Sequence, residues 1–136
     1  MRKISDTSKI FINICICITG FNIVIRNQDD HVKNIAYLMN KSGEWRLSPA
    51  FDVAYSYNPS GAWTSRHQMS INGKRDGFEI DDLLALGKSA AIKPARARRI
   101  IDVVADSVRN WAEFADVAGV DGQTAERIAR AHRVLS

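Results

Sequence analysis

The sequence predicts an α+β fold that is predominantly α, with a small β-hairpin beside a set of helices. Apolar residues recur at helical spacing through much of the second half. Two short apolar runs between residues 35 and 47 flank a turn that contains a glycine, and a dense polar cluster precedes them. With 136 residues, of which 46% are apolar and 25% charged, the chain suits one domain with a real core.

The apolar run at residues 10–18 gives conflicting signals. Isoleucine recurs at every second position, and this period with β-branched side chains favours a strand. Phe21 and Ile25, however, would suit a helix that leads into the polar cluster. The basic start imitates a signal peptide, but the apolar run is shorter than the roughly 20 residues of a spanning helix and contains Asn13. We therefore expect neither export nor membrane insertion.

The cysteines and the net charge narrow the class of protein. Cys15 and Cys17 have no histidine nearby in the sequence, so we expect two buried thiols and neither a metal centre nor a disulfide. A chain without disulfides is cytoplasmic by default. The net charge of +4 suits a phosphate-bearing ligand. No direct contact with nucleic acid is expected, because Arg98 and Asp102 mark an ordinary exposed helix face.

The hairpin and the loops that follow it can be placed in order. "IAYLM" and "EWRLSPAFDV" are expected to contain two strands, and Gly43 in "NKSGEW" suits the turn between them, so residues 35–47 form the hairpin. Residues 56–67 are expected to be a loop. "HQMSINGKRDG" suggests a short strand that ends at an Asn-Gly turn, residues 72–73. His67 is expected on a solvated strand edge, and a position facing the substrate is the alternative.

The remainder of the chain is expected to be helical. "EIDDLLALG" has acidic residues in its first turn and should end at Gly87. Pro94 suits the first turn of a long helix that continues to Gly119. Asp121 can cap a final helix. The apolar face of the long helix is expected to consist of Ile100, Val104, Val108, Trp111 and Ala115, with Phe114 also in the core.

The polar cluster "RNQDDHVKN", residues 26–34, has the composition that phosphoryl transfer requires. In protein kinases a base aspartate is followed after four residues by an asparagine that binds metal, and a second aspartate comes later from a strand end. Asp29 and Asn34 have this spacing, and Asp52 follows the second expected strand. The hairpin would return Asp52 to the loop, where the three groups could hold Mg²⁺. A polar turn followed by an unrelated aspartate is the alternative interpretation.

"RNQDDHVKN" together with "WRLSPAFDV" resembles the HipA kinases, the toxin half of bacterial toxin–antitoxin pairs. Their catalytic loop reads approximately N-x-D-x-H-x-K-N, and their metal-binding aspartate follows an L-[ST]-P-x-[YF]-D pattern. The resemblance covers about residues 21–136 and leaves residues 1–20 as a divergent N-terminal segment. It implies a helical, kinase-like C-terminal lobe whose hairpin carries the catalytic and metal-binding loops.

The resemblance also implies roles and partners. It implies Asp29 as the catalytic base, with His31 and Lys33 beside it, and Asn34 and Asp52 as ligands of Mg²⁺. ATP and Mg²⁺ would be the cofactors, the substrate would be a protein phosphorylated on Ser or Thr, and a DNA-binding antitoxin would be a partner. The residues expected at the ATP site are His31, Val32, Lys33, Asn34, Phe51 and Asp52.

Two other functions compete with an active kinase. The sequence contains no glycine-rich phosphate loop and no preceding strand with a lysine, so we expect the N-terminal lobe to be absent and the truncated lobe to be weak or inactive alone. A non-enzymatic module that binds an antitoxin or a full-length kinase is the first alternative. A basic nucleic-acid-binding domain is the second. Asp30 is expected to be a solvated neighbour of Asp29 or a brace of the loop.

Overall fold

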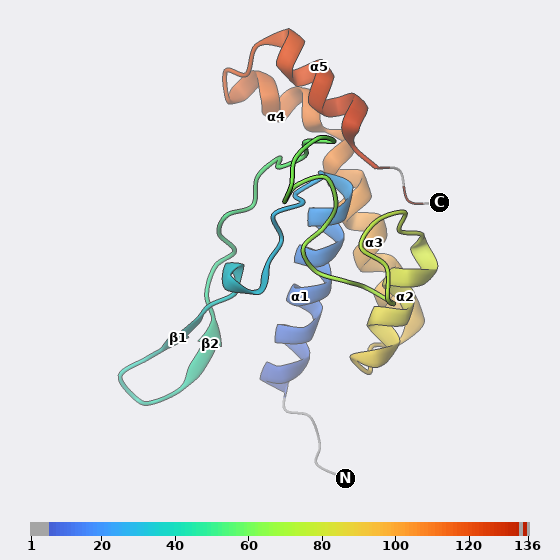
Figure 1. The fold of residues 1–136 in the computed structure, drawn as a ribbon. Helices are drawn as coiled ribbons and strands as arrows, with labels where there is room; N and C mark the ends of the chain where they lie inside the picture. Colours follow the sequence, from blue (N-terminus) through green and yellow to red (C-terminus); the bar gives the residue numbers. More distant parts are fainter. Residues whose placement is uncertain (1–5, 134, 136) are drawn as a thin grey trace.

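A computed structural model describes residues 6–133 and 135, with side chains from residue 12 onward. Within these residues the fold is predominantly helical with one small antiparallel hairpin, which confirms the expected α+β class (Figure 1). The elements in chain order are α1 (Asp6–Val24), η1 (Val32–Asn34), β1 (Tyr37–Met39), β2 (Trp45–Leu47), α2 (Ile80–Ser89), α3 (Pro94–Arg109), α4 (Trp111–Val117) and α5 (Gly122–Ala131).

Residues 10–18 belong to helix α1, so the expectation of a strand there is wrong. The buried positions of α1 include Ile16, Gly20 and Ile23, which share one face at helical spacing, whereas Ile14 is 40% exposed. That face packs against α3 and α2. The burial of this face outweighs the local preference of isoleucine for strands.

The two cysteines of α1 are free thiols, but they are not both buried as expected. Cys17 is exposed and Cys15 is half-buried, because they lie beside the packed face rather than on it. Partial burial raises the pKa of both thiols, which favours the protonated, unreactive form. None of the helices in the described part of the chain combines the length and apolar character that a membrane crossing requires.

Helix α1 lies at the centre of the molecule, with α2 and α3 along one side and the hairpin on the other (Figure 1). The main core cluster joins the C-terminal half of α1 to α2, α3 and the segment before α2. Its fully packed members are Ile23, Ile71, Phe78, Leu83 and Ile101. A smaller cluster of Val24, Val104 and Val108 fixes the last turn of α1 against α3. The residues that follow α1 therefore start from a rigid point.

The hairpin is confirmed, and it projects away from the helices (Figure 1). Tyr37 pairs with Leu47 and Met39 pairs with Trp45. Gly43 lies in the turn with a φ of 82°, a conformation that other residues adopt at a cost. The expected strand before residues 72–73 is reduced to a single bridge across the confirmed turn.

Helix α2 continues past Gly87 to Ser89, so the expected stop at Gly87 is wrong. A Cβ atom added at Gly87 would lie 2.8 Å from the Cβ of Ala97. Gly87 therefore allows α2 and α3 to approach closely rather than ending the helix.

The long helix expected from Pro94 to Gly119 is divided in two at Asn110, which separates α3 from α4. The residues of the expected apolar face are nevertheless covered: Val104, Val108 and Ala115 are buried, and Ile100 is half-buried. Phe114 is 57% exposed, contrary to expectation, while Trp111 is half-buried and its Nε1 donates to the carbonyl of Ala125 at 2.9 Å.

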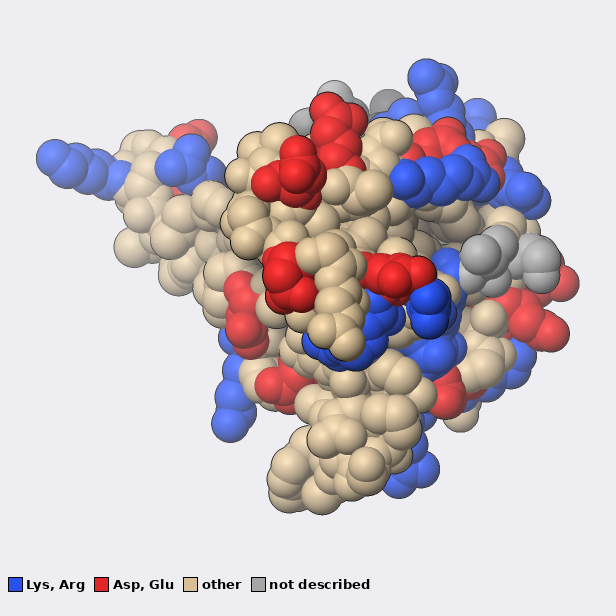
Figure 2. Space-filling model, turned by 90° about the horizontal axis from the view of Figure 1, so that it is seen from above, with Lys and Arg blue, Asp and Glu red and all other residues tan. Residues whose placement is uncertain are grey.

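Some charged side chains on α3 and α5 pair with others on the same helix. The expected pair of Arg98 and Asp102 is present at 2.9 Å. On the face seen in Figure 2, acidic and basic side chains lie among one another. The carboxylate of Asp121 caps α5 as expected by accepting from the backbone N–H of Thr124 at 2.9 Å.

Asp82 is a buried carboxylate at the start of α2 with three donors. It accepts from Asn72 Nδ2, Lys74 Nζ and the backbone N–H of Glu79, each at 2.9 Å. The hydrogen bond from Asn72, followed by those from Glu79 and Lys74, lowers the pKa of Asp82 to about 2. The carboxylate thereby fixes the turn at residues 72–73 to α2.

We predict that Gly87→Ala destabilises the protein by about 1–3 kcal/mol, because the added methyl group meets Ala97 in a packed helix contact. Gly20→Ala is the matched control, since nothing lies within 4 Å of a Cβ added there. That control should gain about 0.5–1 kcal/mol from helix propensity. Urea unfolding of the three proteins measures both effects, and equal stability of Gly87→Ala and the wild type would contradict the close packing.

We predict that Asp82→Asn lowers stability at neutral pH by about 1–3 kcal/mol, because one amide cannot accept all three hydrogen bonds. Since the folded pKa lies below the ordinary 3.8, the contribution of the carboxylate is complete above pH 4 and is lost as the pH falls through about 2. The difference between wild type and variant should therefore shrink on acidification. Exposed Asp81→Asn is the control and should remain within about 0.5 kcal/mol of wild type in urea unfolding.

Candidate functional site

The chain leaves α1 through Arg26, which adopts a left-handed conformation with a φ of 62°. The side chain of Arg26 compensates for this strain, because its Nε donates to the carbonyl of Ala131 at 2.9 Å. Its guanidinium also lies 4.2 Å from the centroid of the Tyr57 ring. The exit from α1 is thus fixed by contacts to distant parts of the chain.

In the segment that follows, the backbone turns at Asp30, where His31 N donates to the Asp29 carbonyl at 3.0 Å. Gln28 and Asp30 are buried, while Asp29 and His31 are partly exposed. The Gln28 amide can donate to the carbonyl of Thr64 at 2.7 Å and accept from Arg133 at 3.2 Å. The interior side chains thus hold the segment, and Asp29 and His31 remain on its open side.

Asp30 is a brace of the loop, and the expectation that His67 lies on a solvated edge is wrong. His67 is completely buried, and its Nδ1 lies 2.8 Å from the carboxylate of Asp30. The same carboxylate accepts from the backbone N–H groups of Gln68 at 2.8 Å and Met69 at 3.4 Å. Burial opposes ionisation of Asp30, but the hydrogen bond from His67 and those from the backbone outweigh it, so the pKa of Asp30 is lowered.

Asp52 arrives from the other side, behind the hairpin. Its backbone is left-handed, with a φ of 54°, a conformation that is uncommon outside glycine although aspartate adopts it more readily than most residues. Asn27 holds it there, since Asn27 Nδ2 donates to the Asp52 carbonyl at 3.0 Å and to Asn22 Oδ1 at 3.1 Å. Strain of this kind is concentrated at functional sites. The side chain of Asp52 is exposed.

Asp29, His31 and Asp52 converge on one point. One ligand atom from each lies within 4.8 Å of the others. His31 Nε2 is 4.0 Å from the Asp29 carboxylate, and His31 Nδ1 is buried without a hydrogen-bond partner in the described part of the chain. Two carboxylates and an imidazole nitrogen form a donor set that suits a divalent cation. The expected return of Asp52 to the loop therefore occurs.

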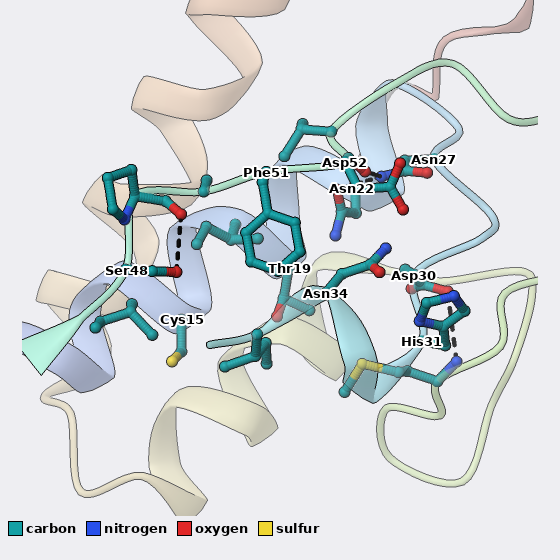
Figure 3. Close-up of a pocket in the computed structure, with 17 residues that line it drawn as sticks. Cys15, Thr19, Asn22, Asn27, Asp30, His31, Asn34, Ser48, Phe51 and Asp52 are labelled. Atoms are coloured by element: carbon teal, nitrogen blue, oxygen red, sulfur yellow. Dashed lines mark hydrogen bonds between the residues drawn. The ribbon is translucent and has the colours of Figure 1, made fainter. Parts of the chain in front are cut away.

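Asn34 lies in the same pocket as Asp52 (Figure 3). Its Nδ2 donates to the carbonyl of Asp29 at 3.1 Å, so the end of η1 is tied back to the loop. Phe51 also lines the pocket and is 44% exposed. The pocket encloses about 50 Å³, which is room for an ion with a few water molecules.

The structure separates the expected ATP-site residues into two groups. His31, Asn34, Phe51 and Asp52 line the pocket. Val32, which is 71% exposed, and Lys33 lie on the outside of η1 and are not part of its lining. The roles assigned to these residues remain predictions.

Sequence reasoning missed the supports beneath the site. His67 lies 37 residues from Asp30, and nothing in the local pattern links the two positions. Residues 27–31 are all polar, so the local sequence neither distinguishes the buried side chains from the exposed ones nor identifies the partner of Asp30.

Comparison with known proteins identifies the family. Searches of curated proteins and of solved structures returned no match. Residues 5–130 match the family of HipA-like C-terminal domains, a span that contains all the described helices and strands except the last residue of α5. The chain therefore belongs to the HipA-like C-terminal domain family.

Proposed function

We propose that this domain contributes the metal- and phosphate-binding side of an ATP- and Mg²⁺-dependent protein kinase site that acts on Ser or Thr. The observation that carries the proposal is the convergence of Asp29, His31 and Asp52 within 4.8 Å. Membership of the HipA-like family, which is related to kinases, supports it.

The residues of the site have distinct tasks in this proposal. Asp52 and Asn34 would hold Mg²⁺, which supplies positive charge to phosphate oxygens when bound. Asp29 is half-exposed and can orient or accept the proton of an incoming Ser or Thr hydroxyl. His31 lies beside it and can fix its carboxylate or contact the transferred group. Lys33 is exposed and long enough to meet phosphate charge.

Nucleotide binding by the described residues is expected to be weak. The pocket of about 50 Å³ suits the ion and one phosphate group, not a whole nucleotide. Phe51 and Val32 offer exposed apolar surface beside it, where ATP would be only partly covered. We therefore expect low turnover from this chain alone, with a protein as the phosphate acceptor and a DNA-binding antitoxin as a partner.

An interaction module is the second candidate, and the hairpin favours it. Leu38, Met39 and Trp45 are 43%, 58% and 62% exposed. Exposed apolar residues gathered on one projecting element are typical of protein–protein contacts. In that case the hairpin would bind a protein partner without any need for the metal cluster.

The two functions predict different responses to MgATP. If the kinase proposal holds, MgATP at about ten times its Kd stabilises the wild type by about 1.4 kcal/mol, visible as a rise in Tm. Asp52→Ala should abolish this rise because it removes one metal ligand from the cluster. Asp116→Ala is the matched control, since it removes an exposed carboxylate from α4 and should leave the rise unchanged.

Differential scanning fluorimetry with ATP, with Mg²⁺ and with both separates the ion from the nucleotide. A Tm of the wild type that MgATP does not alter, or an equal rise in Asp52→Ala, would refute the kinase proposal and leave the interaction module.

A further inference from the structure

We propose that the buried Asp30–His67 pair positions Asp29 and His31 for metal binding, so that His67 is a positioning residue of the candidate site. The inference rests on the proposed function, because it takes Asp29, His31 and Asp52 to be a divalent-cation site. His67 has no described contact with Asp29, His31 or Asp52. It would therefore act on them through Asp30 alone.

The pair is held by a directed set of hydrogen bonds. His67 Nδ1 faces the Asp30 carboxylate at 2.8 Å, so this nitrogen carries the proton and donates. The N–H groups of Gln68 and Met69 bond the other oxygen of the same carboxylate. Three successive residues thus hold one side chain, which leaves Asp30 little freedom to rotate.

Asp30 lies between Asp29 and His31, so fixing its side chain restrains both neighbours. The Asp29 carbonyl, part of the peptide that joins Asp29 to Asp30, accepts from His31 N at 3.0 Å and from Asn34 Nδ2 at 3.1 Å. The peptide is therefore held from the pocket side while the Asp30 side chain is held from the interior. Side chains that converge to within 4.8 Å depend on such restraint.

His67 is itself rigid, because it belongs to the packed interior. Its backbone exchanges hydrogen bonds with Arg75: His67 N donates to the Arg75 carbonyl at 3.0 Å, and Arg75 Nε donates to the His67 carbonyl at 2.6 Å. Its ring meets Phe78 edge to face, with the centroids 5.2 Å apart. Phe78 is part of the main core cluster, so the pair connects the open loop to the core.

Met69 adds a second connection between this segment and the site. It lines the pocket of Asp52 and Asn34, and its backbone N–H bonds Asp30. Met69 therefore lines the pocket, and the segment 67–69 to which it belongs supports the loop. A loss of the bond from His67 would loosen both.

The test compares two substitutions of His67 by their affinity for Mn²⁺ alone. His67→Asn keeps a donor where Nδ1 lies, whereas His67→Leu has a similar volume but cannot donate. We expect His67→Leu to bind Mn²⁺ about 10–100-fold more weakly than wild type, the usual cost of removing a group that orients a metal ligand. His67→Asn should restore most of the affinity. Electron paramagnetic resonance of free Mn²⁺ gives the affinities, at a temperature where circular dichroism shows each protein folded.

Asp82→Asn provides the matched control, because Asp82 is also a buried carboxylate with three donors but does not line the pocket. It should lose stability and keep its affinity for Mn²⁺. If it loses affinity as well, the effect is general loosening and the positioning role is refuted. If His67→Leu does not fold, the double variant Asp30→Asn/His67→Leu replaces it, because the double variant lacks the unpaired carboxylate charge. Its affinity for Mn²⁺ is then compared with that of Asp30→Asn.

Two failures can be told apart. A wild type that does not bind Mn²⁺ refutes the metal site, and with it both the proposed function and this inference. If the wild type binds Mn²⁺ and a folded His67→Leu variant binds it with equal affinity, the metal site stands. Only the role of His67 is then overturned.

Discussion

The site depends on one constraint, the anchoring of Gln28 and Asp30 in the interior just after the last turn of α1. With these two side chains buried, Asp29 and His31 lie on the open side of the segment. A helical continuation of α1 would have sent these four side chains in different directions around an axis. The left-handed Arg26 prevents that continuation.

Much of this arrangement follows from local sequence, and some does not. The hairpin could be predicted because a glycine turn between short apolar runs determines its own geometry, and its return brings Asp52 to Asp29. Helix α1 could not be predicted in this way. The isoleucine pattern indicates a local preference for a strand, whereas the packing of one face of the segment against α3 makes it helical. The break at Asn110 and the close contact at Gly87 are likewise set by neighbouring helices.

The supports of the site were the hardest features to anticipate. The contacts of Asp30 with His67, of Gln28 with Thr64 and of Arg26 with Ala131 each join residues far apart in the sequence. A sequence motif identifies the residues that face a ligand, because binding or reaction at the ligand restricts which residue types can occupy those positions. The residues behind them need only offer a suitable donor at a suitable place, and many sequences can meet that need.

The hairpin has a mechanical consequence for the pocket. Its two strands run almost directly into the segments that bear Asn34 and Asp52, and its outer end points away from the helices (Figure 1). Movement of the outer end of such a hairpin is transmitted to its base, which lies at the pocket. A force applied at the turn near Gly43 would change the spacing of Asn34 and Asp52 at the base of the hairpin, so a partner that binds the turn would also alter the pocket.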